Sequence, residues 1–333
     1  MADTVLVTGI SGYIGSHVAA KLLEQGFKVR GTVRALGKGQ RILKALDAHG
    51  ADVSGVDLVQ ANLASDEGWK GAVAGCRFIQ HIASPFPMDA PRDREALVPE
   101  ARAGAMRVIE QGLAAGAERI VMTSSMVAMM GQPNRGDRML VTEDDWSDPD
   151  WKPLTAYPVS KTRAELAAWD YVRSHALQDR LTTVCPGLVV GPDPFGNGGA
   201  SLELIKALME GDFPMSPKIA YPIVDVRDCA AIHVAAMTAP EAGGRRLMAA
   251  AETLWLQQVA DILKAAFPTR KLPRREMPSW LVRALALFDD RVKGVVPDLG
   301  TFHEADSAYV TNLTQVKPRK VEASLVEAGA VFA

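Results

Sequence analysis

The feature that most constrains the fold is a short apolar segment followed at once by three evenly spaced glycines. Residues 5–7 read Val-Leu-Val, and Gly9, Gly12 and Gly15 follow at a spacing of three. From residue 14 onward, apolar side chains recur at the spacing of a helix. The segment therefore predicts a buried strand, a glycine turn and a helix, which together make a binding corner for a dinucleotide pyrophosphate.

Each glycine has its own predicted part in this corner. Gly9 permits the tight turn, Gly12 lets the backbone approach the pyrophosphate, and Gly15 lets the helix pack close to the strand. The unpaired N–H groups at the start of the helix then face the phosphates. A glycine trio alone also occurs in ordinary turns, so the prediction depends on the strand and helix around it. The other expected cofactor-binding residues of this corner are Thr8, Ser11, Tyr13 and Ile14.

Beyond this corner, apolar strands alternate with helices. The expected strands are 28–34, 56–62, 78–83, 119–125 and 181–185; the expected helices are 40–49, 69–74, 98–115 and 157–175, with loops over 35–39 and 131–154. Such alternation predicts a parallel sheet covered on both faces. We therefore expect an α/β, Rossmann-type doubly wound fold. Residues 1–187 plus about 223–250 would form the nucleotide-binding domain, and 188–222 plus 251–333 a smaller, mostly helical substrate domain.

Composition narrows the class of protein. The chain has 333 residues, 48% of them hydrophobic, and a formal net charge of −2, which gives no reason to expect a nucleic-acid or membrane partner. No apolar run approaches the roughly 18 residues of a membrane helix. Because the first strand begins by Val5, we expect no signal peptide and a cytoplasmic protein. Cys76, Cys185 and Cys229 are expected to be buried and unpaired, and the six histidines lack metal-ligand spacing.

The end of the second expected strand indicates which dinucleotide binds. NAD-preferring folds of this type usually place an acid there, but no carboxylate lies between Gln25 and Arg41. Arg34 stands in that place instead, and a guanidinium binds a 2′-phosphate well. Arg34, helped by Arg41 or Lys38, therefore favours NADP(H). The alternative is that Arg34 is an ordinary solvated residue at a strand end.

A second constellation carries chemistry. Tyr157 and Lys161 lie four residues apart on one predicted helix and therefore share a face. A cation about 4 Å from a phenol, at an effective dielectric of 20, favours its ionised form by about 4 kcal/mol, which brings it toward the range of acid–base catalysis. Ser125 ends the fifth strand, at the edge of a parallel sheet that faces the ligand. We therefore predict a catalytic Ser125, Tyr157 and Lys161, although each alone could be an ordinary turn or surface residue.

These residues, taken together, resemble the extended short-chain dehydrogenase/reductases, and within them the dihydroflavonol reductase-like carbonyl reductases. The matching segments are 8–15, 29–34, 123–125, 143–148, Tyr157-x-x-x-Lys161 and 186–192. The resemblance implies that Arg34 contacts the 2′-phosphate and that Lys161 also binds the nicotinamide ribose. Further cofactor contacts are expected from Asn62, Leu63, Ala83, Ser84, Pro186 and Leu188.

The chain departs from the family pattern in three places. Asn62 stands where the family usually has Asp, and an amide can still bond an adenine amino group. Residues 126–130 are rich in methionine, which suits either core packing or an adaptable pocket wall. The Asn-Trp-Tyr-Cys-Tyr signature of cinnamoyl-CoA reductases is missing around Tyr157, which argues against a CoA thioester substrate.

The resulting hypothesis is an NADPH-dependent, reversible aldehyde or ketone reductase with a small apolar or aromatic substrate. Ser125 would bond the carbonyl and Tyr157 would supply the proton. Candidate pocket residues are Phe86, Met88, Val127, Pro192 and Tyr221. The alternatives are a nucleotide-sugar epimerase or dehydratase on the same fold and a catalytically silent NADP-binding sensor. The sequence leaves open whether the protein is a monomer or a homodimer.

Overall fold

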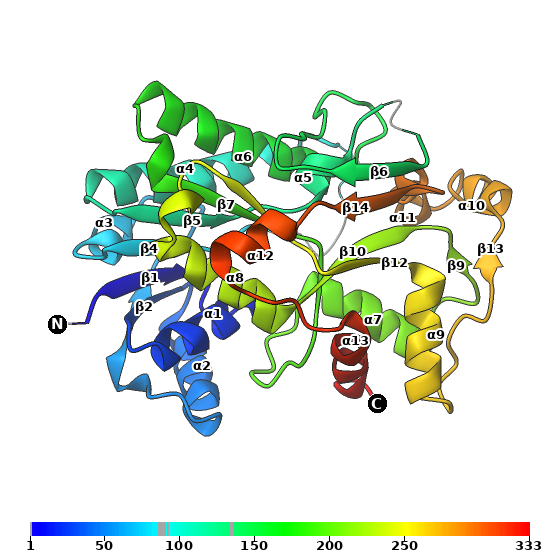
Figure 1. The fold of residues 1–333 in the computed structure, drawn as a ribbon, viewed down its shortest axis with the longest axis horizontal. Coiled ribbons are helices and arrows are strands. Elements are labelled where there is room, and N and C mark those ends of the chain that lie inside the picture. Colours follow the sequence, from blue (N-terminus) through cyan, green and yellow to red (C-terminus); the bar gives the residue numbers. More distant parts are fainter. Residues whose placement is uncertain (1, 86–90, 92, 134–135) are drawn as a thin grey trace.

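The computed structural model of the chain describes residues 2–85, 91, 93–133 and 136–333. Its centre is a seven-stranded parallel sheet in the order β11-β7-β5-β4-β1-β2-β3 (Figure 1). The strands are β1 (Thr4–Thr8), β2 (Lys28–Val33), β3 (Val56–Gln60), β4 (Phe78–His81), β5 (Arg119–Thr123), β7 (Leu181–Pro186) and β11 (Arg246–Ala249). Strand order reverses beside β1, and ligands of doubly wound folds bind at this position. The predicted fold class is confirmed.

Helices cover both faces of this sheet, as the residues of β1 illustrate. Val5 and Val7 are fully buried in one apolar cluster, whereas Leu6 between them is buried in a second one. The first cluster includes α1 (Tyr13–Glu24), α2 (Leu36–Ala48) and α8 (Val226–Thr238). The second includes α3 (Trp69–Val73), α4 (Val98–Ala114) and α6 (Ala156–Ser174). Alternate side chains of a strand point to opposite faces, which is why nearly all-apolar strands predicted a two-sided sheet.

The later part of the chain forms smaller sheets beside the first. One has the order β12-β10-β8, and two-stranded pairs join β13 to β9 and β14 to β6. The strands are β6 (Arg138–Val141), β8 (Leu188–Val190), β9 (Ser216–Pro217), β10 (Ala220–Asp225), β12 (Glu252–Trp255), β13 (Glu276–Met277) and β14 (Phe302–Ala305). The helices are α7 (Ala200–Glu210), α9 (Leu256–Ala266), α10 (Ser279–Leu285), α11 (Asp290–Lys293), α12 (Ala308–Thr314) and α13 (Val321–Ala330). The domain boundaries given above stay a prediction.

Several expected elements differ in the structure. α2 begins at Leu36, within the expected loop 35–39, and Gly39 lies in its first turns against Leu58. The expected loop 131–154 contains β6, which pairs with β14 some 160 residues later in the chain, as in the register Arg138 to Phe302. Residues 127–130 form a short helix, α5 (Val127–Met130), rather than a continuation of β5. The earlier start of α2 concerns only neighbouring residues. β6 forms because it pairs with β14, and no pattern near residues 138–141 predicts that pairing.

Among the described residues, no helix is long and apolar enough to cross a membrane. Cys76, Cys185 and Cys229 are free and buried, as expected.

Candidate active site

The glycine turn between β1 and α1 has the tight geometry that its spacing predicted. Gly9 has φ +67°, in the left-handed region, and its carbonyl accepts the N–H of Gly12 at 2.9 Å. A Cβ on Gly15 would lie 2.2 Å from the Gly9 oxygen, so helix and strand approach as closely as the backbone permits. The N–H of Gly9 is held by the Thr32 hydroxyl at 3.1 Å. The N-cap of α1 is Gly12, which makes no side-chain hydrogen bond to the first turn, so the first N–H groups of the helix are left for a ligand.

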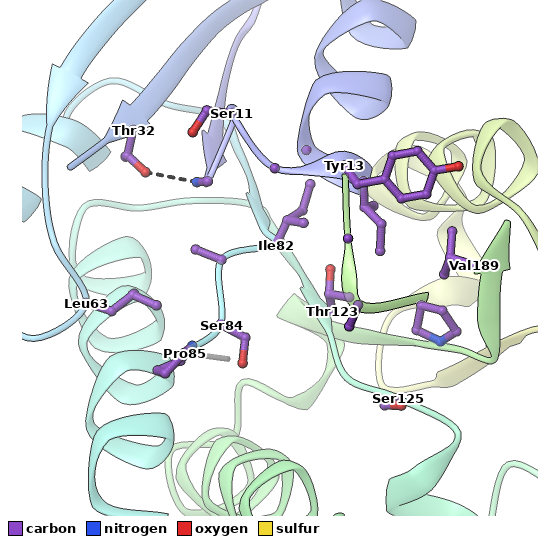
Figure 2. A pocket seen from close by; sticks show the side chains of 18 of the residues that line it. Ser11, Tyr13, Thr32, Leu63, Ile82, Ser84, Pro85, Thr123, Ser125 and Val189 are labelled. Carbon is purple, nitrogen blue, oxygen red and sulfur yellow. Dashed lines mark hydrogen bonds between the residues drawn. The ribbon is translucent and has the colours of Figure 1, made fainter. Parts of the chain in front are cut away.

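A cavity of about 540 Å³ opens from this turn toward the ends of β5 and α6. In Figure 2, Ser11 and Thr32 lie at one end of the view and Ser125 at the other. The volume falls within the usual range for small-molecule and cofactor sites. The predicted residues that line it are Gly9, Ser11, Gly12, Tyr13, Ile14, Gly15, Arg34, Asn62, Leu63, Ala83, Ser84, Ser125, Tyr157, Lys161 and Pro186.

Three predicted cofactor residues do not line the cavity, namely Thr8, Arg41 and Leu188. Thr8 instead supports the site from beneath, because its hydroxyl oxygen accepts the N–H groups of Ile82 and Ala83 at 2.9 and 3.0 Å. With both lone pairs used, its proton is donated to Nδ1 of His81, 3.0 Å away. Thr8 therefore fixes the end of β4 and does not itself line the cavity.

The cavity has further walls that the sequence did not single out. Residues 198–201 cover the glycine turn from the start of α7, and a Cβ on Gly199 would lie 3.3 Å from Cβ of Tyr13. Thr32, Ile82 and Val189 also line it. The glycines of 196–199 were a usable signal, but nothing local indicates that this segment returns to the first helix.

The donor set fits a phosphorylated dinucleotide. The bare N–H groups of α1 lie at the glycine turn, and the exposed Arg34 lies on the cavity wall with no carboxylate partner in the described part of the chain. Asn62 also lines the wall, although its Oδ1 already accepts the Ala64 N–H at 3.2 Å. Glycine backbone and a free guanidinium are the groups that suit a pyrophosphate and a 2′-phosphate.

The predicted trio meets at the other end of the cavity. Ser125 is 9% exposed just past β5, and its hydroxyl is hydrogen-bonded to the Tyr157 phenol. Lys161, one turn further along α6, is 6% exposed, and its Nζ donates to the carbonyl of Thr123 at 3.2 Å. The end of one strand and one face of one helix therefore bring together a hydroxyl, a phenol and an ammonium.

Burial dominates the electrostatics of the trio. Burial raises the pKa of Tyr157, and the hydrogen bond with Ser125 opposes that shift. The lowering of the Tyr157 pKa that the Tyr-Lys spacing predicted is therefore not seen, because burial is the largest influence on the phenol. The Lys161 ammonium donates instead to the Thr123 carbonyl. Burial also lowers the pKa of Lys161 to about 8, against the opposing charge of Glu165.

The expected substrate residues are less well placed. Val127, Pro192 and Tyr221 do not line this cavity, whereas Phe86 and Met88 lie outside the described residues. The carbonyl of Pro192 instead lies 3.3 Å from Nε2 of His17. Met126 and Met129 are buried in a cluster with Cys185, which assigns them to core packing rather than to a pocket wall.

Glycine corner, reversal of strand order and hydroxyl-phenol-ammonium trio together define a dinucleotide-dependent oxidoreductase. A family model described as the NAD dependent epimerase/dehydratase family matches residues 5–249. The chain belongs to that family, and the extended short-chain dehydrogenase/reductase relationship is confirmed, in its carbonyl reductase subgroup.

Individual relatives agree with this subgroup. Cinnamoyl-CoA reductase 1 of Arabidopsis thaliana is 34% identical over 278 residues, covering 82% of this chain and 77% of that protein. The NADPH-dependent methylglyoxal reductase of Saccharomyces cerevisiae is 30% identical over 296 residues, covering 80% and 84%. The solved structure of Gre2 from Candida albicans in complex with NADPH superimposes with a TM-score of 0.78 at 25% identity, covering 99% of both chains.

Proposed function

We propose that the protein reduces a small apolar or aromatic aldehyde or ketone with NADPH, and that Ser125, Tyr157 and Lys161 carry the chemistry. The observation that carries the proposal is the meeting of these three side chains at one end of the cavity that begins at the glycine turn. The enzyme class and the cofactor expected from the sequence agree with the NADPH-dependent relatives.

The parts of the cavity divide the work of holding the cofactor. The N-terminus of α1 would hold the pyrophosphate, and Arg34 the 2′-phosphate. Lys161, already held by the Thr123 carbonyl, would hold the nicotinamide ribose. When bound, the nicotinamide supplies the hydride.

The protein's own residues handle the oxygen and the proton. The Ser125 hydroxyl donates a hydrogen bond to the substrate carbonyl oxygen and so orients it toward Tyr157. The Tyr157 phenol then gives its proton to that oxygen as negative charge develops. The Lys161 ammonium stabilises the phenolate that remains, which is the charged state that burial alone disfavours. In the reverse direction the same groups take the proton from an alcohol.

A nucleotide-sugar dehydratase on this fold would need acids just after the serine. Residue 126 is instead Met126, 1% exposed, and Val127 begins α5 with its N–H donated to the Ser125 hydroxyl at 3.3 Å. The described cavity wall also includes the apolar side chains of Pro85, Pro186 and Val189. These features favour aryl or alkyl carbonyls over sugar phosphates.

The test is a panel of aliphatic and aryl aldehydes, ketones, sugar nucleotides and acyl-CoA thioesters, with NADPH and NADH run in parallel. The proposal predicts NADPH oxidation with aldehydes or ketones, and weaker oxidation of NADH. Absence of NADPH oxidation across the whole carbonyl panel would contradict it. Turnover of a sugar nucleotide without net cofactor oxidation would favour the epimerase alternative instead.

A further inference from the structure

Three consecutive residues at the end of β5 contact three successive turns of α6. The hydroxyl of Ser125 bonds the phenol of Tyr157, and the carbonyl of Thr123 accepts Nζ of Lys161 at 3.2 Å. Between them, the hydroxyl of Ser124 donates to Oε2 of Glu165 at 2.6 Å. The helix residues follow at intervals of four and share one face. Two of these contacts involve the proposed catalytic groups, and the third belongs to a carboxylate that the mechanism does not yet use.

Glu165 is fully buried and saturated with hydrogen bonds. Arg246, on β11, binds it in the bidentate manner, Nε to Oε1 at 2.8 Å and Nη2 to Oε2 at 3.1 Å. Thr183 of β7 and Trp169 of α6 also donate to it, at 2.8 and 3.2 Å. The carboxylate therefore ties α6 to β5, β7 and β11 at the level of the trio.

Arg246 is held just as firmly by the acidic segment that the sequence singled out. Its Nη1 donates to the carbonyl of Glu143 at 3.0 Å and to that of Asp145, and its guanidinium lies 3.7 Å from the ring centroid of Trp146. The Glu143 carboxylate in turn pairs with Arg245. Residues 143–148 thus form the outer support of a buried ion pair that reaches the active site.

Stability alone does not explain such a pair. Desolvating two charges costs so much that an apolar pair of similar volume is often equally stable. The geometry offers another reason, since Glu165 accepts the hydroxyl of Ser124, the residue next to Ser125, and lies one helical turn beyond Lys161. We propose that Glu165, held by Arg246, is a positioning residue that fixes the end of β5 against α6 and supplies the negative charge beside Lys161. This inference rests on the proposed roles of Tyr157 and Lys161.

The other groups facing Lys161 do not supply that charge. Burial together with the Lys161 ammonium lowers the pKa of His81 on β4 to about 3, so its ring is neutral. Burial raises the pKa of the Cys185 thiol on β7 to about 12, so it is neutral as well. Burial would raise the pKa of Glu165, but Arg246 and the hydrogen bonds from Ser124 and Thr183 hold it below its usual value. The charged groups next to Lys161 that these contacts describe are therefore Glu165 and Arg246, which carry charges of opposite sign.

The test uses two substitutions that each remove one charge of the pair: Glu165→Gln, which keeps the size of the side chain, and Arg246→Gln, which shortens it. Removing the negative charge lowers the pKa of Lys161 and of the Tyr157 phenol alike, and removing the positive charge raises both. The alkaline limb of kcat/KM should move down by about one pH unit in Glu165→Gln and up in Arg246→Gln. The matched control is Glu95→Gln, whose carboxylate pairs with Arg163 on the outer side of α6 at 3.1 Å and is 45% exposed. The alkaline limb of kcat/KM in Glu95→Gln should stay at the wild-type pH.

A second readout needs neither substrate nor cofactor. The phenolate absorbance of Tyr157, taken as the difference from Tyr157→Phe in each background, should titrate with the same opposite shifts. The charge role of Glu165 would be overturned if both variants lost activity and melting temperature in parallel while the alkaline limb of kcat/KM and the Tyr157 titration stayed where they are in the wild type. This titration is measured on the free protein and does not depend on turnover. If Tyr157→Phe kept wild-type turnover, the assignment of Tyr157 as proton donor would be refuted, but the titration would still test the charge role of Glu165.

If either charge variant fails to fold, Ser124→Ala tests the positioning role while keeping the ion pair. It should lower kcat about tenfold and leave the KM for NADPH and the pH limb unchanged, since a lost hydrogen bond to a charged group is worth about that factor. Ser124→Thr, which keeps the hydroxyl, should restore most of the rate. Wild-type kcat in Ser124→Ala would overturn the positioning role.

Discussion

Arg34 is the residue that most directly sets the choice of cofactor. It directly follows β2, lines the cavity and has no carboxylate partner within the described residues, so its guanidinium is available to a ligand. Arg41, named beside it from the sequence, is also exposed but does not line the cavity. The two arginines therefore make a matched pair of which only one should matter.

Replacing Arg34 with Ala should weaken NADPH binding about 10- to 100-fold, because a charge-assisted hydrogen bond is worth roughly 1.5–3 kcal/mol. NADH binding should stay unchanged, because NADH has no 2′-phosphate. Arg41→Ala should change neither. Fluorescence titration of both cofactors measures this, and equal weakening for NADPH and NADH would show that Arg34 acts on the fold rather than on the phosphate.

At the scale of residues, the sequence predicted the proposed catalytic side chains better than the residues that hold them in place. Tyr157 and Lys161 could be recognised because a spacing of four on a helix is a local fact. Glu165 has the same spacing from Lys161, but its importance depends on Arg246, 81 residues away. Val127, Pro192 and Tyr221 were proposed for the pocket from their position in the chain alone, and side-chain direction at loops is not a local property.

At the scale of elements, the glycine turn between β1 and α1 is tightly constrained. A Cβ on Gly15 would lie 2.2 Å from the Gly9 oxygen and 3.0 Å from its carbonyl carbon, both of them backbone atoms that cannot move aside alone. α1 can therefore reach β1 only because Gly15 lacks a side chain. Gly37, in α2, offers a contrast, since a Cβ there would meet nothing within 4 Å.

Gly15→Ala should displace α1 from β1 and so disrupt the phosphate site. We expect a loss of about 1–3 kcal/mol in the free energy of unfolding and at least tenfold weaker NADPH binding. Gly37→Ala should be neutral or stabilising by up to about 1 kcal/mol, from helix propensity alone. Thermal melting with and without NADPH separates the two variants. Wild-type affinity in Gly15→Ala would contradict the close-approach argument.

Elements with strong local signals were predictable and the others were not. Six of the seven strands of the central sheet and helices α4 and α6 lie within one or two residues of their predicted ends, because buried strands and long amphipathic helices leave clear patterns. The seventh strand, β11, was not predicted. β9, β13 and the β6–β14 pair are short and lie in loop-like sequence. Their pairing depends on contacts made by the whole fold. The local sequence of these segments therefore predicted helices and loops instead of strands.

At the scale of the whole molecule, three of the four buried histidines of the described residues lie on separate elements and bear on the pH dependence of stability. His17 lies on α1, His81 on β4, and His233 on α8, where its Nε2 lies 2.8 Å from the Thr123 hydroxyl. Burial lowers their pKa values to about 4, 3 and 4 respectively. In His81 the Nδ1 accepts the proton of Thr8, so protonation would break that support of β4.

Because of these histidines, we expect the free energy of unfolding to fall already at pH values above those at which ordinary carboxylates titrate. Between pH 4 and 6.5 the unfolded chain binds more protons than the folded one, so stability falls as the pH falls through that window. At pH 5 each histidine costs about 2 kcal/mol relative to pH 7. Burial raises the pKa of Asp298 to about 6, which favours the folded state in acid and offsets about 1 kcal/mol of the loss.

Urea unfolding at pH 7 and pH 5 should therefore differ by about 4 kcal/mol, a large part of a typical total stability. His175→Gln, at an exposed position, should leave that difference unchanged. Equal stability at the two pH values would contradict the assignment of these histidines as neutral in the fold.

The central claim is that Tyr157 donates the proton in an NADPH-dependent carbonyl reduction, and Tyr157→Phe tests it most directly. The substitution keeps the ring that fills the site and removes only the hydroxyl bonded to Ser125. NADPH binding should persist while kcat for the best aldehyde or ketone falls by about 10²- to 10⁴-fold, the usual contribution of a positioned acid. Turnover equal to the wild type, with NADPH still bound, would contradict the account.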